Sequence, residues 1–218
     1  TLRINNIFIF HITYLFHIMA NFDTVANIKK NVYVLNTYNE IALISYNSHS
    51  KHLLGYKSEQ LINESIVSIK SLFPRYEKVN FVSGGGTMAN KRAILDSISF
   101  NPKTIKKDVK KNIVLFSSME HASIHITIAN SLSQRGYTII FIPSTVKGLI
   151  DVAKFSELLE QYNKCIALIS IHSVNNEIGT IQNISQLVQL THSNDPNTIF
   201  HSDSAQGIYY INQWEYIP

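Results

Sequence analysis

Two hydrophobic patterns alternate along residues 78–203. Short runs that are almost wholly apolar predict strands buried on both faces, whereas apolar residues repeated every three or four positions predict helices. We therefore expect strands at residues 78–83, 112–117, 137–142, 165–171 and 198–203. The stretches between them predict helices at residues 87–99, 121–135, 152–162 and 184–191.

The preceding part of the chain is less regular. Residues 31–36 form a short apolar segment, and residues 47–55 have the composition of a polar loop. A helix is predicted next, because four apolar residues recur at helical spacing before Pro74, which ends it. These four residues are Ile62, Ile66, Ile69 and Phe73.

Strands that alternate with helices over this many units predict an α/β fold with a mainly parallel sheet and helices on both faces. No internal repeat or linker interrupts the pattern, so we expect one domain over residues 31–218. In open α/β sheets, ligands bind at the edge formed by the carboxyl ends of the strands. Polar side chains that directly follow a strand are therefore the first candidates for a site.

Residues 1–30 are predicted to be an apolar N-terminal extension. The run from Ile7 to Ile18 is almost wholly apolar, but a helix of this length is too short to span a bilayer comfortably. Arg3 precedes the run, so the core of a signal peptide is an alternative. Met19 opens a sequence typical of an ordinary N-terminus, and we interpret residues 1–18 as upstream sequence or an extension. We expect no membrane association.

The composition is that of a globular protein, with 45% hydrophobic residues, 16% charged residues and a net charge of +4. Lysines gather at residues 103–111, between two predicted elements, and we interpret this segment as a solvated loop. It lacks the interleaved aromatic residues of a single-strand nucleic-acid binder, so we expect no nucleic-acid partner. The single cysteine, Cys165, excludes an internal disulfide and lies in an apolar run typical of an inert thiol. No metal site is predicted.

Two junctions after predicted strands carry candidates for binding a phosphate and an aromatic ring. At Ser83–Thr87, contiguous glycines precede a helix, whose free N–H groups and positive dipole end favour an anion. The Thr87 hydroxyl adds a hydrogen-bond donor. His121 opens the next predicted helix, where its imidazole could stack on a ring. The alternatives are an ordinary strand-to-helix turn and an ordinary histidine at a helix start.

Two further junctions carry amides and a carboxylate. Asn175 and Asn176 follow one buried strand, and Asp203 and Gln206 follow the next. A carboxylate placed there needs a cation or a hydrogen-bond donor, and a protonated pyridine nitrogen is one such partner. The alternatives are an asparagine-rich turn and an Asp203 that caps the next turn.

In this order the motifs resemble those of the NifS/IscS-type cysteine desulfurases. These proteins belong to the class V aminotransferase group of fold-type I enzymes that use pyridoxal 5′-phosphate (PLP). The motifs are Ser-Gly-Gly-Gly-Thr, Glu-His, Val-Asn-Asn-Glu-Ile-Gly and His-Ser-Asp-Ser-Ala-Gln. Residues 47–55 resemble the family's Asn-Pro-x-Ser-x-His-x-x-Gly loop, and the resemblance covers residues 31–210. It implies that residues 31–218 form an incomplete large domain of a PLP-dependent transferase.

The resemblance also implies roles for the first candidates. The Gly86 amide and Thr87 would hold the phosphate of PLP. His121 would stack on the pyridine ring and serve as a catalytic residue.

The remaining candidates would surround the other side of the pyridine ring. Asp203 would pair with the pyridinium nitrogen through a charge-assisted hydrogen bond. Gln206 would bond the phenolic oxygen, and Asn176 would lie near that oxygen and the substrate.

Several departures from the family pattern accompany these matches. The family's Schiff-base lysine, in a Ser-x-His-Lys segment, and its nucleophilic cysteine both lie further along than Pro218, and Cys165 matches nothing catalytic. The phosphate loop has one extra glycine. The family's Tyr-Leu-Asp-Asn-Ala-Ala segment is degraded at residues 33–38. We therefore expect this chain alone to be inactive.

In a complete protein, the resemblance implies removal of sulfur from L-cysteine, which leaves alanine and an enzyme persulfide. It also implies a homodimer, a sulfur-acceptor protein, a role in iron–sulfur cluster assembly and a cytoplasmic location. One alternative is another class V activity, such as an aminotransferase, a selenocysteine lyase or a kynureninase-like hydrolase. A second is an inactive truncated homologue that acts as a scaffold, and a Rossmann-type nucleotide binder is a more distant third.

Overall fold

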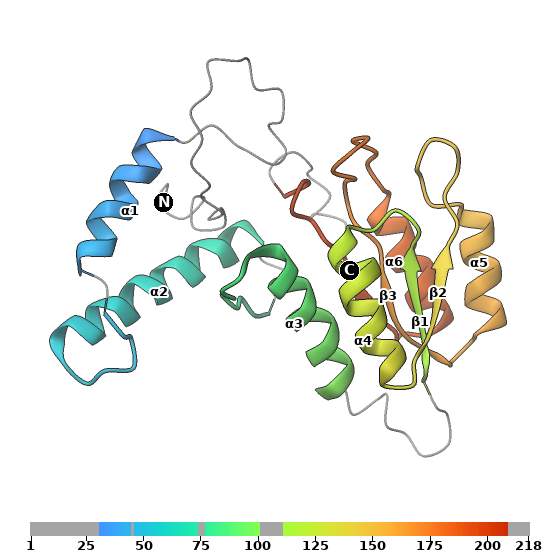
Figure 1. Cartoon of the computed structure of the whole chain (residues 1–218), viewed down its shortest axis with the longest axis horizontal. Helices are drawn as coiled ribbons and strands as arrows, with labels where there is room; N and C mark the ends of the chain where they lie inside the picture. The colour runs from blue at the N-terminus through green and yellow to red at the C-terminus, as the bar shows by residue number, and fades with distance from the viewer. Residues whose placement is uncertain (1–30, 45, 74–76, 101–110, 209–218) are drawn as a thin grey trace. The chain divides into compact units, whose positions relative to one another are not determined.

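A computed structural model describes residues 31–44, 46–73, 77–100 and 111–208 (Figure 1). The chain divides into two compact units, Thr1–Phe81 and Val82–Pro218. The extension expected at residues 1–30 and most of the lysine-rich segment lie outside the described residues. The division into an extension and a domain over residues 31–218 therefore stays a prediction.

The first unit contributes two helices, α1 (Val32–Ile44) and α2 (Leu53–Leu72). The apolar segment at residues 31–36 is the start of α1. The predicted helix before Pro74 is confirmed as α2, but it begins inside the segment predicted to be a polar loop. The reason is a capping interaction, in which the His52 Nδ1 atom accepts a hydrogen bond from the Gly55 amide at 3.2 Å.

Glycine is required at position 55 because the backbone of the preceding loop passes close to it. A Cβ atom at this position would lie 2.0 Å from the carbonyl oxygen of Ser50. The loop before α2 is further held by the Tyr46 amide, which donates to the Ser58 Oγ atom at 2.8 Å. These contacts explain why polar residues and a glycine are found in residues 47–55.

The second unit contains a parallel sheet with the strand order β2-β1-β3-β4. In chain order the strands are β1 (Ile113–Ser117), β2 (Thr138–Ile142), β3 (Ile166–Ser170) and β4 (Ile199–His201). These strands confirm four of the five that the apolar runs predict. The parallel sheet of the predicted α/β fold is thus present.

The strand predicted at residues 78–83 is wrong. The described residues 78–82 have no regular secondary structure, and residues 83 and 84 form a bend before α3 (Gly85–Phe100). The Phe81 side chain is 43% exposed, and Val79 and Val82 are only half-buried. An apolar run without a core to cover it lacks the burial that would stabilise a strand.

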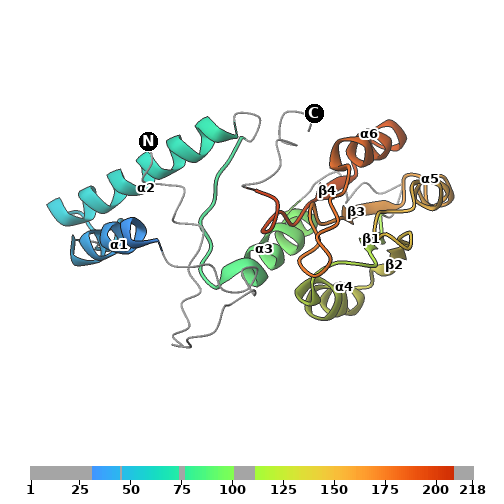
Figure 2. The ribbon, with the colours of Figure 1, turned by 90° about the horizontal axis from the view of Figure 1, so that it is seen from above.

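Helices cover both faces of the sheet, as expected (Figure 2). On one face, α5 (Val152–Gln161) and α6 (Ile184–Asn194) pack against the strands through buried residues that include Phe155, Leu159 and Leu187. On the other face, α3 and the helix that follows β1 form a second cluster, which includes Ile94, Ile98, Ile124, Ile128 and Leu132.

The helix predicted at residues 121–135 has two parts. A π-helical segment, η2 (Ser123–Ile128), leads directly into α4 (Ala129–Gln134). The Ala129 amide donates to the Ile124 carbonyl oxygen, five residues back, which is the π-helical spacing. Such wide turns occur frequently at functional sites, and this one begins two residues after His121.

The strand register brings three strand ends to one level. Phe116 of β1 is paired with Ser170 of β3, and Ser170 is paired with His201 of β4. The segments that follow these strands, residues 118–122, 171–176 and 202–206, therefore start side by side at one edge of the sheet. This is the edge that the alternating pattern predicts for the site.

In the described residues, no helix is both long and apolar enough to cross a lipid bilayer.

Lys111 corrects the interpretation of the lysine-rich segment as a solvated loop. Its Nζ atom lies 2.6 Å from the Asp195 Oδ2 atom, and the two side chains are only 7% and 9% exposed. Burial by itself raises the pKa of Asp195. The hydrogen bond and charge of Lys111, together with hydrogen bonds from Asn197, outweigh burial and lower this pKa below its ordinary value. Lys111 thus joins the start of β1 to the end of α6.

We expect Lys111→Met to lower the free energy of unfolding by about 3 kcal/mol, because it leaves the Asp195 carboxylate buried without its cation. Urea denaturation monitored by circular dichroism would measure the change. The matched control is Lys154→Met, which removes the exposed ion pair with Glu157 and should change the unfolding midpoint little. Equal losses in the two variants would contradict a stabilising role of the buried pair.

Candidate active site

A pocket lies at the edge of the sheet where β3 and β4 end. It is shallow and open to solvent, and its lining residues come from the segments that follow β1, β3 and β4. Four of the six predicted site residues line it, namely His121, Asn176, Asp203 and Gln206. The remaining lining residues are His172, Val174 and Ala205.

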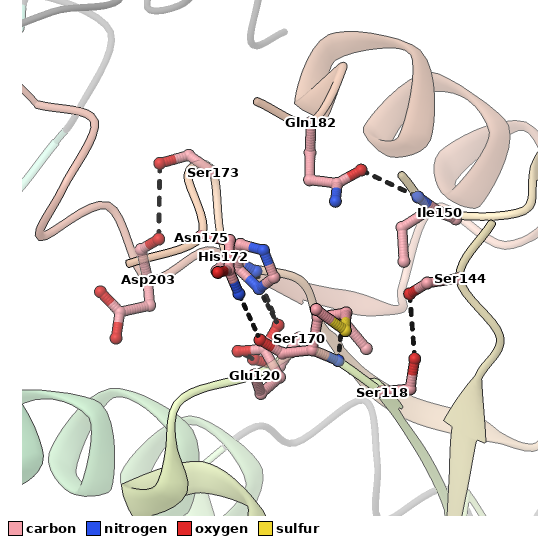
Figure 3. Close-up of polar contacts among 12 residues, drawn as sticks. Ser118, Glu120, Ser144, Ile150, Ser170, His172, Ser173, Asn175, Gln182 and Asp203 are labelled. Atoms are coloured by element: carbon pink, nitrogen blue, oxygen red, sulfur yellow. Dashed lines mark hydrogen bonds and ion pairs between the residues drawn. The ribbon is translucent and has the colours of Figure 1, made fainter. Parts of the chain in front are cut away.

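Asp203 is held from three directions, of which Figure 3 shows the contact with Ser173. Its Oδ2 atom accepts a hydrogen bond from the Asn90 side chain at 2.7 Å, and its Oδ1 atom accepts one from the Ala205 amide at 3.0 Å. Its main-chain oxygen accepts from the Ser173 amide at 2.9 Å. Asp203 therefore caps the next turn and also lines the pocket. Each carboxylate oxygen retains acceptor capacity for a further donor.

Asn90 is a site residue that sequence reasoning missed. It is buried on α3 and is separated from Asp203 by 113 positions in the chain. The available signal was its position three residues after Thr87, because residues i and i+3 lie on the same face of a helix. Asn90, which contacts Asp203, therefore lies on the same face of α3 as Thr87, the candidate phosphate-binding residue.

Gly86 and Thr87 do not line the pocket. Both are exposed in the first turn of α3, where the first N–H groups of a helix have no partner within the helix. Gly84 precedes this turn with φ +102°, a conformation that favours glycine, and a Cβ atom there would lie 2.5 Å from the Met88 side chain. The same helix carries Asn90, which contacts Asp203.

His121 directly precedes the helix and lines the pocket. Its Nδ1 atom accepts a hydrogen bond from the Ser123 amide at 3.2 Å and lies 3.0 Å from the Ser123 Oγ atom. Because Nδ1 accepts from the amide, the ring proton of neutral His121 resides on Nε2. The contacts with Ser123 are those of the helix-start alternative, and the stacking of His121 on a ring stays a prediction.

The two adjacent asparagines have different surroundings. Asn175 is buried, and its Oδ1 atom accepts from the amides of Glu177 and Ile178, both at 2.9 Å. Its Nδ2 atom donates to the Met119 carbonyl oxygen at 3.1 Å. Asn175 thus builds the turn, whereas Asn176 lines the pocket.

A buried carboxylate–imidazole pair lies beside the pocket and was also missed (Figure 3). The Glu120 Oε1 atom accepts from the His172 amide at 2.7 Å and lies 3.3 Å from the His172 Nδ1 atom. The Ser170 hydroxyl lies 3.5 Å from Glu120 Oε2 and 2.8 Å from the His201 Nδ1 atom. The Glu-His motif directed attention to His121, while the contacts of Glu120 depend on tertiary structure.

Three buried side-chain polar atoms in the described part of the chain have no hydrogen-bond partner: His172 Nε2, Ser202 Oγ and Ser204 Oγ. All three belong to the segments that follow β3 and β4, next to Asp203. Buried polar atoms are normally hydrogen-bonded, so this edge of the sheet has the capacity to bind a polar ligand. A pocket with a carboxylate, amides and imidazoles fits the pyridine ring of PLP.

The sequence pattern of the class V aminotransferase family matches residues 20–213. The chain belongs to the class V aminotransferase family. Members of this family are PLP-dependent enzymes. The matched segment includes every residue that lines the pocket.

Relatives with known names agree with this assignment. The chain is 30% identical over 191 residues to a NifS/IcsS protein homolog of Lactobacillus delbrueckii, covering 87% of the chain and 47% of that protein. It is 31% identical over 161 residues to the cysteine desulfurase IscS of Buchnera aphidicola subsp. Baizongia pistaciae, covering 74% of the chain and 37% of that protein. The chain thus spans about half or less of the length of these relatives.

A solved structure supports the fold. The NifS-like protein of Rickettsia africae superposes with a TM-score of 0.68 and 26% identity, over 85% of this chain and 47% of that one. The chain therefore has part of the α/β fold of the type I PLP enzymes.

We expect His201 to titrate below the ordinary histidine pKa of about 6.5. Removal of the ring from water lowers the pKa of His201, and the charges of Glu120 and Asp203 oppose this shift without cancelling it. The folded protein then binds this proton less readily than the unfolded chain. Acidification through the window between the two pKa values therefore destabilises the fold.

Nuclear magnetic resonance titration of the His201 ring would measure this pKa. Between about pH 7 and about pH 5, a His201→Asn variant should lose less of its unfolding free energy than the wild type. Parallel losses in the two proteins would contradict the expected contribution of His201.

Proposed function

We propose that this chain is the PLP-binding part of a cysteine desulfurase. The observation that supports this most is the common pocket of Asp203, His121, Asn176 and Gln206, which are separate in sequence. The hydrogen bond from Asn90 orients Asp203 at the end of β4. A pocket that only filled space would not need this combination of carboxylate, imidazole and amides.

The negative charge of Asp203 favours a ligand with a cationic group. Among the residues that the structure describes, the only acidic side chain in the lining of the pocket is that of Asp203. A protonated pyridine nitrogen satisfies a carboxylate in this position through a charge-assisted hydrogen bond. In this proposal Asp203 binds that nitrogen, while Asn90 prevents the carboxylate from turning away.

The other residues position the ring and the phosphate. His121 stacks on the pyridine ring, and its Nε2 proton is available to a bound substrate. Asn176 and Gln206 bind near the phenolic oxygen. Gly86 and Thr87 bind the phosphate at the start of α3, where free N–H groups favour an anion. Bound PLP would supply the electron sink for the reaction.

The proposed reaction removes sulfur from L-cysteine and leaves alanine. In the longer relatives the resemblance places a Schiff-base lysine and a nucleophilic cysteine beyond the segment matched here. We infer that the complete protein acts as a cytoplasmic homodimer and passes sulfur to an acceptor protein for iron–sulfur cluster assembly. Without that lysine and cysteine, the 218-residue chain by itself should bind PLP and not turn over cysteine.

The first test is binding of 4′-deoxypyridoxine 5′-phosphate, a PLP analogue without the aldehyde, which cannot react with surface lysines. We expect the chain to bind this analogue in isothermal titration calorimetry. Asp203→Asn should weaken binding roughly tenfold or more, because a neutral amide replaces the charged partner of the ring nitrogen. Thr87→Val should weaken binding of the phosphorylated analogue and leave binding of unphosphorylated 4′-deoxypyridoxine unchanged.

The matched control is Asp96→Asn, an exposed carboxylate on α3 that pairs with Arg92. This variant should bind the analogue as the wild type does. Failure of the wild-type chain to bind the analogue would favour the scaffold alternative. Equal affinity of the Asp203→Asn variant and the wild type would show that the ligand is not recognised through Asp203.

A further inference from the structure

Glu120 is the residue directly before His121 and has no role in the proposed set of PLP contacts. Its side chain is fully buried. Burial of a carboxylate is unfavourable unless hydrogen-bond donors surround it. A buried glutamate next to a residue that lines the pocket is therefore a candidate for a positioning role.

The Glu120 carboxylate takes the place of a strand carbonyl at the edge of the sheet (Figure 3). The amides of Ile171 and Ser173 donate to β4 and the segment that follows it. Successive amides of an extended chain point to opposite sides, so the amide of His172 points to the β1 side, where β1 has already ended. Glu120 Oε1 accepts from this amide at 2.7 Å and thereby satisfies a buried N–H group that the sheet leaves without a partner.

Further contacts extend this connection. The Ser170 hydroxyl, at the end of β3, lies 3.5 Å from the Glu120 Oε2 atom. The Asn175 side chain, in the segment that follows β3, donates to the main-chain oxygen of Met119 at 3.1 Å. The segment that follows β1 is thus joined both to β3 and to the segment that follows β3.

His121 and Asn176 lie on the two segments that these contacts join, and both line the pocket. Among the described residues, the hydrogen bonds of His121 itself are with residues 123–125, in the helix that follows it. Those bonds orient the ring within its own segment. The contact that joins this segment to the one carrying Asn176 comes from the adjacent residue, Glu120.

We infer that Glu120 is a positioning residue, whose carboxylate holds the His172 amide and so fixes His121 relative to Asn176 for stacking on the bound ring. This inference rests on the proposed function. Stacked rings attract each other only at close contact, and a displacement of about 1 Å loses up to roughly half of that attraction. A side chain that fixes the residue next to His121 therefore affects the affinity for the ring without contacting it.

The test measures binding of 4′-deoxypyridoxine 5′-phosphate to the full chain by isothermal titration calorimetry. His121→Ala removes the stacking ring and should weaken binding roughly tenfold. Glu120→Ala should weaken binding by a similar factor, because His121 is then present but displaced. The double variant should bind no more weakly than His121→Ala, since the effects of residues that act together are not additive.

A second measurement separates positioning from a general loss of stability. The His121 ring protons, assigned by their loss in His121→Ala, should shift upfield in nuclear magnetic resonance spectra when the analogue saturates the wild type. Glu120→Ala should abolish this shift in the folded protein, whereas loss of a residue that only stabilises the fold would leave it unchanged. Glu120→Gln keeps an oxygen acceptor for the His172 amide and should retain both the affinity and the shift.

The matched control is Glu157→Ala, which removes an exposed carboxylate on α5 and should bind the analogue as the wild type does. Should Glu120→Ala not fold, Glu120→Asp decides by the same criteria. Its carboxylate is shorter by one methylene group and no longer reaches the His172 amide in the same geometry.

The outcomes distinguish this inference from the proposed function. If the wild type binds the analogue and Glu120→Ala binds it equally well, the inference is wrong and analogue binding stands. Additive losses in the double variant, unchanged affinity in His121→Ala, or a loss in Glu120→Gln as large as in Glu120→Ala would also overturn it. If the wild-type chain does not bind the analogue, the proposed function fails and this inference fails with it.

Discussion

The parallel register of β1, β3 and β4 is the constraint on which the candidate site depends. Pairing of Phe116 with Ser170, and of Ser170 with His201, makes the three strands end at one level. A shift of one residue would turn each side chain of a strand to the opposite face of the sheet. The two apolar clusters, one on each face, oppose such a shift because both would lose buried area.

The carboxylates of Asp203 and Glu120 at this edge of the sheet are each stabilised by hydrogen bonds from the protein. Asp203 accepts hydrogen bonds from a helix side chain and from its own turn, and Glu120 accepts from a main-chain amide and from an imidazole. Glu120 is fully buried, where an unpaired charge would cost several kcal/mol, whereas Asp203 is half-buried. Each acidic group is thereby held in place at this edge of the sheet, and the adjacent His172 Nε2 atom has no partner in the described structure.

The local hydrophobic pattern was sufficient to predict most elements of the second unit, because its central strands β1 and β3 are fully buried. Continuous apolar runs identified β1 to β4, and helical spacing identified α5 and α6. The same rule was wrong at residues 78–83, where an apolar run has no core to cover it. Lys111 was assigned to a solvated loop because its buried partner, Asp195, is 84 positions away. Both differences arise from burial, which depends on distant parts of the chain.

The sequence by itself determined the fold class, the edge of the sheet that carries the candidate site and the residue types that follow each strand. Alternation and strand-end polarity are local properties, so His121, Asn176, Asp203 and Gln206 could be chosen without coordinates. Tertiary structure alone decided which of these residues share a pocket, and it added Asn90, Glu120 and His172. The physical reason is that a hydrogen bond between residues 52 or 113 positions apart leaves no periodic pattern in the sequence.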